Sequence, residues 1–183
     1  MLESRLCHLD LVTPAVYPEL YQLLVGGDGS YRWRFRGVTP DPRGFEASLW
    51  EGNLAQFVLT GPKSRSIAGL VSAYGFDGPA GIVQVGVFLA EPYRRATWPL
   101  FGVGYFLNYL FDHWPIRKIY SHIPGYNLDA VRIARRAGFE TEGVLVDYVY
   151  GLGSFWDEHV LALERAVWEQ SRLQRYLARA ASQ

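Results

Sequence analysis

The first part of the chain changes between strand-like and helix-like spacing of its apolar positions. Residues 7–12, CHLDLV, have the period of two that is typical of a half-buried strand. Residues 13–25 then carry apolar side chains at helical spacing behind Thr13, which is a suitable N-cap. The run GGDGS breaks this helix, and after YRWRFRG (31–37) a second helix is predicted over 41–50.

The central part of the chain predicts a hairpin, a buried strand and a long helix. Residues 55–60 and 66–76 are expected to form two antiparallel strands joined across GPKSR. Residues 81–90, GIVQVGVFLA, are almost continuously apolar, which predicts a strand buried on both faces. A buried helix over 98–114 is closed by Pro115.

The last part of the chain continues this alternation. It predicts a strand at 118–123, a helix at 127–139, two strands around 143–150 and 159–164, and a final helix over 165–181. Two apolar strands that are each followed by a helix require a parallel pair, so we expect a ligand cleft where the strands 81–90 and 118–123 separate. The fold class is therefore α/β, with a mixed sheet.

Composition and charge limit the possible functions. Of the 183 residues 49% are hydrophobic, which is enough for one packed domain. Eighteen basic and eighteen acidic residues leave no net charge to attract nucleic acid or an acidic membrane to the whole molecule. The single cysteine, Cys7, excludes an internal disulfide and a thiolate metal cluster, and no N-terminal apolar run is typical of a signal peptide. We therefore expect a cytoplasmic monomer or homodimer with no metal and no membrane contact.

Two local patterns carry a family resemblance. Asn127 and Ala130 open a helix that ends in Gly138-Phe139, and residues 142–163, EGVLVDYVYGLGSFWDEHVLAL, form a closing hairpin. In this order the patterns resemble the GNAT superfamily of N-acyltransferases, in the branch that acetylates the N-termini of ribosomal proteins. The resemblance covers roughly residues 5–168. It implies the GNAT fold, a mostly antiparallel twisted sheet with a splayed parallel pair and helices on both faces.

The resemblance also implies a domain organisation and a donor. The GNAT domain would span residues 1–168, and residues 169–183 would be a helical extension of the same domain. Acetyl-CoA or another acyl-CoA is the usual donor of the family. Its pantetheine arm would pair with the backbone of Val87, Phe88 and Leu89, and Asn127 would lie on the donor side.

One corner departs from the family pattern. GNAT members place an Arg or Gln, two variable residues, Gly, one residue, and Gly or Ala where backbone amides hold the pyrophosphate. Here the matching residues are Arg94, Arg95, Ala96, Thr97, Trp98 and Pro99, so Thr97 and Pro99 replace the two small residues and the bulky Trp98 lies between them. Either this corner is remodelled for another donor, or Thr97 caps a helix that Pro99 starts while Trp98 fills core. In both cases, Arg94 and Arg95 remain able to pair with phosphates.

Acyl transfer to an amine needs a group that accepts the amine proton. His122, on the strand beside the expected cleft, is the first candidate, and a packed or surface histidine is the alternative. Glu91, just after the buried strand, is the second candidate, unless it only closes a turn. Many GNAT members place a tyrosine acid seven residues after the Asn; here Ala134 occupies that position, so the role is vacant or is filled from elsewhere, for instance by Tyr120 or Tyr126.

The acceptor side has two candidate regions. The run YRWRFRG interleaves basic and aromatic residues, namely Tyr31, Arg32, Trp33, Arg34, Phe35 and Arg36. If this run is extended, its arginines and aromatics lie on opposite faces, and RNA would be a suitable partner; otherwise the aromatics pack inward. Asp147 and Tyr148 of the closing hairpin are expected to face the pocket, whereas Asp157 is expected to brace a turn.

Three functions are compatible with these features. The first is N-acyl transfer from acyl-CoA to the primary amine of a small molecule or a peptide. The second is an aminoacyl transferase that uses a charged tRNA as co-substrate and needs no cofactor, because an amine also attacks an aminoacyl ester. The third is a binding protein that keeps the fold without catalysis.

Overall fold

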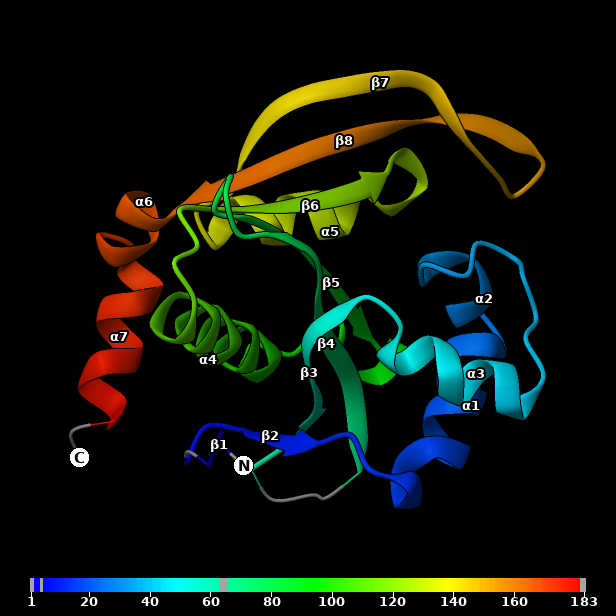
Figure 1. Ribbon diagram of the computed structural model, residues 1–183, viewed down its shortest axis with the longest axis horizontal. Helices are drawn as coiled ribbons and strands as arrows, with labels where there is room; N and C mark the ends of the chain where they lie inside the picture. Colours follow the sequence, from blue (N-terminus) through cyan, green and yellow to red (C-terminus); the bar gives the residue numbers. More distant parts are fainter. Residues whose placement is uncertain (1, 4, 63–65, 182–183) are drawn as a thin grey trace. The chain divides into compact units, whose positions relative to one another are not determined.

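The computed structural model describes residues 2–3, 5–62 and 66–181, which divide into two compact units (Figure 1). The first unit comprises Met1–Gly75 and Gly86–Val103, and the second comprises Phe76–Val85 and Gly104–Gln183. Strand β5 (Ile82–Leu89) and helix α4 (Trp98–His113) each contribute residues to both units. Among the described residues, no helix combines the length and the apolar content that a membrane span needs.

The sheet strands of the first unit follow the order of the chain. They are β1 (Leu2–Glu3), β2 (His8–Leu11), β3 (Asn53–Thr60), β4 (Ile67–Asp77) and the later half of β5. The pairs β1–β2, β2–β3 and β3–β4 are antiparallel. The predicted hairpin of two antiparallel strands is therefore confirmed, although residues 63–65 of its connection lie outside the described residues.

Helices cover both faces of this part of the sheet. One face carries η1 (Pro14–Val16), α1 (Tyr17–Val25), α2 (Gly29–Arg32) and α3 (Pro42–Trp50). Their apolar side chains form a core with Val58 of β3, while Leu59, the next residue, points to the other face and meets Gly102 of α4. Asp41 caps α3 by accepting a hydrogen bond from the Gly44 N–H at 2.7 Å.

The second unit holds the parallel pair that the sequence predicts. Its strands are the early half of β5, β6 (Lys118–Pro124), β8 (Ser154–Glu164) and β7 (Glu140–Gly151), in this order. Strands β5 and β6 pair in parallel from Ile82 with Lys118 to Gln84 with Tyr120, and the pairing ends there although both strands continue. The pairs β6–β8 and β7–β8 are antiparallel.

The expected helices of the second half are present with altered ends. Helix α5 (Leu128–Arg136) follows a short 3₁₀ turn, η3 (Gly125–Asn127). The predicted single helix over 165–181 is instead two helices, α6 (Arg165–Glu169) and α7 (Arg172–Ala181). The break falls at Gln170 and Ser171, where the Ser171 hydroxyl accepts from the Gln174 N–H at 3.0 Å and so begins a new helix.

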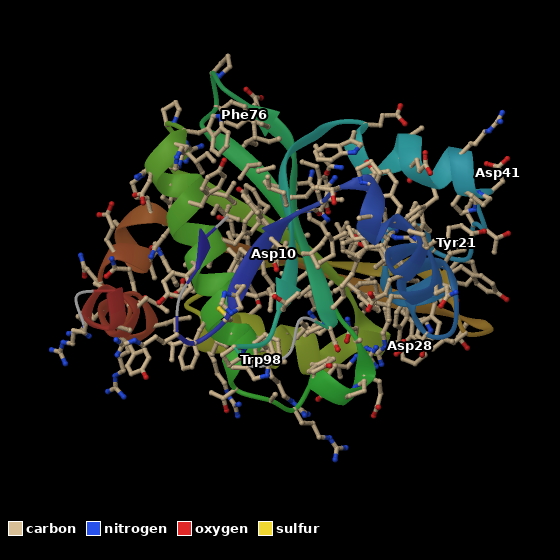
Figure 2. The ribbon with its side chains drawn as sticks, turned by 90° about the horizontal axis from the view of Figure 1, so that it is seen from below. Asp10, Tyr21, Asp28, Asp41, Phe76 and Trp98 are labelled. Atoms are coloured by element: carbon tan, nitrogen blue, oxygen red, sulfur yellow. The ribbon has the colours of Figure 1, made fainter. Side chains whose placement is uncertain are left out.

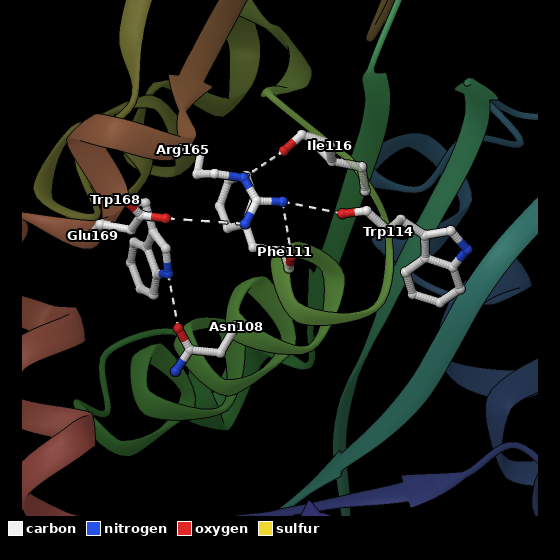
Figure 3. A network of polar contacts seen from close by, with 7 residues as sticks. All are labelled: Asn108, Phe111, Trp114, Ile116, Arg165, Trp168 and Glu169. Atoms are coloured by element: carbon white, nitrogen blue, oxygen red, sulfur yellow. Dashed lines mark hydrogen bonds and ion pairs between the residues drawn. The ribbon is translucent and has the colours of Figure 1, made fainter. Parts of the chain in front are cut away.

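Arg165 closes the C-terminal end of α4 (Figure 3). Its Nε donates to the Ile116 carbonyl at 2.8 Å, and its Nη2 donates to the carbonyls of Phe111 and Trp114 at 2.7 and 3.0 Å. Carbonyls at the C-terminal end of a helix lack N–H partners within the helix. The guanidinium of Arg165 supplies the missing donors. Trp168 adds a further contact from α6, an Nε1–H bond to Asn108 Oδ1 at 2.8 Å.

The predicted burial of β5 on both faces is wrong. Buried and partly buried positions alternate along it, with Val83 and Val85 buried and Val87 43% exposed. The physical reason lies in the short pairing of β5 with β6, which ends at Gln84 although the strand continues to Leu89. An apolar run does not by itself show how many of its faces are covered.

Candidate functional site

Three backbone amides of the corner that follows β5 are bonded within the protein. The 3₁₀ turn η2 (Glu91–Tyr93) follows directly after β5 and Ala90, and successive N–H groups close turns on the preceding carbonyls. Tyr93 N–H donates to Ala90 at 3.0 Å, Arg94 N–H to Glu91 at 3.3 Å, and Ala96 N–H to Tyr93 at 3.1 Å. Glu91 itself is exposed at the first position of η2. These amides are therefore committed within the protein.

Trp98 and Pro99 take structural positions at the start of α4. The Trp98 ring packs edge-on against Tyr93, with centroids 5.8 Å apart, and it also borders Gly61. Pro99 is buried in the first turn, and the Leu100 N–H bonds back to the Thr97 carbonyl at 3.1 Å. Trp98 is labelled in Figure 2. Thr97 directly precedes the helix and Pro99 lies in its first turn, as one of the two expected arrangements has it, but Trp98 is only partly buried and so does not fill core.

The fit of this corner to a coenzyme A diphosphate is therefore partial. Residues 91–100, which are all described, offer no glycine at the family positions, and Pro99 has no N–H. Arg95 and Thr97 are exposed, so a guanidinium and a hydroxyl remain accessible to an anion. The residues present fit a diphosphate through side chains and not through a bare backbone cradle.

Arg94, a predicted donor-binding residue, is directed toward the protein itself. Its Nε donates to the Leu89 carbonyl at 2.9 Å, and its Nη1 forms an ion pair with Asp28. The guanidinium also lies 6.0 Å from the centroid of the Phe88 ring. Asp28 additionally contacts Arg32 at 3.1 Å, and the hydrogen bond from Arg94 lowers the pKa of its carboxyl.

The basic and aromatic run is not extended, and of the two predicted arrangements the structure shows the one in which aromatic side chains pack inward. Its first residues form α2, and Trp33 turns inward with only 5% of its surface exposed. Arg34 donates to the Ser48 carbonyl and to Asn53 Oδ1, and Arg36 has a positive φ of 48°. The Arg32 guanidinium lies 5.6 Å from the Tyr31 ring centroid. Intramolecular contacts thus occupy Arg32 and Arg34 and bury Trp33.

Trp33 packs on the later half of β5. Its ring meets that of Phe88 edge-on, with centroids 6.4 Å apart. A Cβ at Gly86 would lie 3.5 Å from the indole and 3.4 Å from Ser72 Oγ. The predicted acceptor residue Trp33 and the predicted donor residue Phe88 are therefore brought together, both within the first unit.

His122 and Glu158 form a hydrogen-bonded pair in the second unit. Nδ1 of His122 lies 3.2 Å from Oε2 of Glu158, on the neighbouring strand β8. The Glu158 residue is only 2% exposed, whereas the His122 side chain is 31% exposed. A buried carboxylate thus supports a histidine that reaches the surface.

Tyr120 belongs to a different cluster, although it shares a strand with His122. A hydrogen bond to Glu142 raises the pKa of Tyr120. Lys118 is bonded to Glu142 and lies 3.4 Å from Glu164, and its hydrogen bond lowers the pKa of Glu142. The Tyr120 hydroxyl is therefore held protonated and engaged with a carboxylate.

The remaining predicted residues lie on other parts of the second unit. Asp147 has a φ of 51° within an interruption of the β7–β8 pairing, and its N–H donates to Asp157 Oδ1 at 3.0 Å. Asp157 therefore braces this turn, as the sequence predicts. Tyr148, within the same interruption, is exposed. Asn127 is the residue that precedes α5, and its side chain makes no capping bond there.

Sequence reasoning missed Glu158 and Asp28. Glu158 had a usable signal, because it shares the period-two face of Val160 and Ala162, and a carboxylate on an apolar strand face needs a partner. Asp28 had no such signal, because the run GGDGS (26–30) is typical of an ordinary break after a helix.

Comparisons with known proteins identify the fold. No protein-family model matches the sequence, and no curated protein matches it. Among solved structures, the spermidine N-acetyltransferase of Vibrio cholerae in complex with CoA and spermine matches with a TM-score of 0.79 at 17% identity, over 88% of this chain and 97% of that chain. A probable acetyltransferase of the GNAT family from Chromobacterium violaceum matches with a TM-score of 0.73 at 22% identity, over 92% of this chain and 87% of that chain.

The ribosomal-protein branch is also represented. RimL, the ribosomal L7/L12 alpha-N-protein acetyltransferase in complex with coenzyme A, matches with a TM-score of 0.72 at 15% identity, over 86% of this chain and 93% of that chain. The TM-scores of 0.72 to 0.79 establish the fold. At identities of 15 to 22%, the assignment to one branch stays a prediction. The chain has the fold of the GNAT N-acetyltransferases, as its sequence patterns predict.

Proposed function

We propose that the chain is an N-acyltransferase that transfers an acyl group from an acyl-CoA to the primary amine of a small molecule or a peptide. The observation that carries this proposal is the pair formed by His122 and the buried carboxylate of Glu158. Such a pair is the arrangement that a general base needs, and the fold is one whose solved members include acetyltransferases bound to CoA.

The pair determines which ring nitrogen of His122 is available. A carboxylate only accepts hydrogen bonds, so Nδ1 carries the proton and Nε2 keeps its lone pair. Nε2 would take the proton of the attacking amine as the new C–N bond forms and the bond between the acyl carbon and its leaving group breaks. Glu158 would then stabilise the imidazolium that results.

The donor is inferred from the fold and from the partial fit of the corner. The backbone of Val87, Phe88 and Leu89 is the expected site of the pantetheine arm. The exposed Arg95 and Thr97 would contact the phosphates, while Trp98 packs inward and Arg94 is paired with Asp28. Because side chains replace backbone amides there, affinity for CoA should be weaker than with a glycine corner.

The acceptor is inferred only as a class. The solved neighbours include enzymes named for spermidine and for the ribosomal protein L7/L12. Tyr31, Trp33, Asp147 and Tyr148 remain the predicted acceptor-side residues. A primary amine on a small molecule or a peptide covers both kinds of neighbour.

The aminoacyl-tRNA alternative loses one of the observations that motivated it, the basic and aromatic surface at 31–37. Trp33 is buried, and Arg32 and Arg34 are bonded within the protein, so they do not form a stacking surface for RNA. Exposed arginines remain on α7, but a solvated helix face accounts for them equally well.

Thiol release from acetyl-CoA tests the proposal. The wild type, His122→Asn and the control His113→Asn are assayed with pools of polyamines, amino acids and short peptides, and CoA binding is measured by calorimetry. His113 is an exposed histidine of the same unit, bonded to the Tyr109 carbonyl at 2.8 Å. We expect all three proteins to bind CoA and only His122→Asn to lose turnover. Absence of CoA binding would exclude an acyl-CoA donor and leave the aminoacyl-tRNA and non-catalytic alternatives, and full turnover in His122→Asn would remove the assigned base.

A further inference from the structure

We propose that Asp28 and Arg94 form an ionic latch that holds the N-terminal end of α2 against the end of β5 and thereby positions the amine acceptor. The acceptor role rests on the proposed acyl transfer, whereas the latch itself does not. Asp28 is a positioning residue here, because it acts through α2 and not on the reacting atoms.

The latch joins two segments that are distant in the sequence. Arg94 bonds to the carboxylate of Asp28 through Nη1 and to the carbonyl of Leu89 through Nε at 2.9 Å. One planar guanidinium therefore connects the start of α2 with the last residue of β5, and a lysine does not offer this fork. Arg32, one turn further along, contacts the same carboxylate at 3.1 Å and joins it to the body of the helix.

The segment held by this latch places Trp33 on β5. The indole lies against Gly86 and meets Phe88 edge-on, so α2 covers the strand half that is predicted to bind the donor. The predicted acceptor-side residues Tyr31 and Trp33 are carried by α2 and by the residue after it. A shift of the N-terminal end of α2 would therefore displace both.

Polar bonding of Trp33 does not hold the segment in place. Within the described residues, Nε1 of Trp33 is buried without a hydrogen-bond partner, and so is Oγ of the neighbouring Ser72. Buried donors without an acceptor destabilise the arrangement in which they occur. The ion pair therefore fixes the N-terminal end of α2, and ring packing fixes Trp33, which follows its C-terminal end. Arg34 anchors the chain beyond Trp33 through Ser48 and Asn53.

Hydrogen exchange tests the latch without any catalytic assay. Three amides report on the segment: Arg32 N–H to the Asp28 carbonyl at 3.1 Å, Trp33 N–H to Gly29 at 3.0 Å, and Gly37 N–H to Ser30 at 2.7 Å. In Asp28→Asn we expect these amides to exchange at least about tenfold faster, since a charge-assisted bond is lost. Asp28→Glu should recover part of the protection.

Asp41→Asn is the matched control. Asp41 lies in the same unit, apart from Asp28 in Figure 2, and makes a structural bond of its own, the cap of α3. It should leave the exchange of the three reporter amides unchanged. Unchanged exchange in Asp28→Asn, or an equal acceleration in Asp41→Asn, would overturn the latch.

Kinetics then test the positioning role. Asp28→Asn should raise the acceptor KM by about tenfold and leave kcat and the CoA dissociation constant within about twofold. Arg94→Gln should raise the acceptor KM by the same factor. The double variant should raise it no further, because each single variant already removes the ion pair between Asp28 and Arg94. Faster exchange with an unchanged acceptor KM would overturn the positioning role alone. If the wild type transfers no acyl group, the proposed function fails, and the exchange experiment still decides the latch.

Discussion

Glu158 Oε2 lies 3.2 Å from His122 Nδ1 across two antiparallel strands, and the carboxylate is almost completely buried. The carboxylate determines the tautomer of the ring because it can only accept a hydrogen bond, which Nδ1–H must donate. An amide at the same place can donate instead, which would leave the proton on Nε2 and abolish its basicity.

Glu158→Gln should therefore lower kcat by about 10²–10⁴-fold, the range that general-base catalysis contributes. Turnover is measured at saturating substrates, and folding is checked by circular dichroism. Glu164→Gln, at an exposed carboxylate of the same strand, serves as the control and should keep full activity. Equal activity of both variants would show that Glu158 does not orient the base.

A glycine corner can be restored by two changes at the start of α4. Thr97→Gly bares the backbone, and Pro99→Ala returns an N–H that the proline lacks. One or two additional bonds to a charged group, at about 1.5–3 kcal/mol each, should outweigh the loss of the proposed Thr97 contact and tighten CoA binding by at least about tenfold. Calorimetry with CoA measures this gain.

Pro92→Ala, at an exposed proline of the neighbouring turn, is the control for that experiment. It should leave the dissociation constant unchanged. If the double variant binds CoA no more tightly than Pro92→Ala does, the diphosphate does not contact this corner.

The ionisation of Asp28 predicts a pH dependence. Its hydrogen bond with Arg94 lowers its pKa in the folded state, so the carboxylate stabilises the fold above the unfolded value of about 3.9, and this contribution is lost as the pH falls through the folded pKa. The difference in Tm between the wild type and Asp28→Asn should be constant from about pH 5 to 8 and should shrink below about pH 4.

Carbon-detected NMR titration provides the direct measurement. The Asp28 carboxyl should titrate below an ordinary aspartate in the wild type and should move upward in Arg94→Gln. A titration that does not change in Arg94→Gln would contradict the assigned cause of the shift.

Arg165 is expected to stabilise the second unit. Arg165→Met removes the bonds to the carbonyls of Phe111, Trp114 and Ile116 but keeps the aliphatic stem against the neighbouring residues (Figure 3). We expect a loss of about 1.5–3 kcal/mol in the free energy of unfolding, measured with urea. Arg172→Met, at an exposed arginine of α7, should change it by less than about 0.5 kcal/mol.

The order of strands and helices was predictable because each long element carries a clear apolar period. The parallel pairing of β5 with β6 followed from two strands that are each followed by a helix, and it is confirmed. Helix α2 was not predictable, because four residues are too few to show a helical period. The break at Ser171 was missed for a related reason: a serine is tolerated within a helix and gives no strong stop signal.

Side-chain partners were harder to predict than elements. His122 was selected from its position near the expected cleft, but Glu158 is 36 residues away, and their contact depends on the register of β6 with β8. The inward turn of Arg94 depends in the same way on Asp28, which gave no pattern of its own. Long-range pairs of this kind are determined by register and loop path, which local periodicity does not encode.

The bare backbone of Gly86 allows the indole of Trp33 to rest on β5. A methyl group at 86 would meet the indole at 3.5 Å, which is ordinary contact, whereas a larger side chain would have to displace the ring. Exchanging the indole for a smaller group would remove this packing without altering the strand. If the proposed acceptor binds beside Trp33, substitutions at 33 are therefore the ones that would admit bulkier amines.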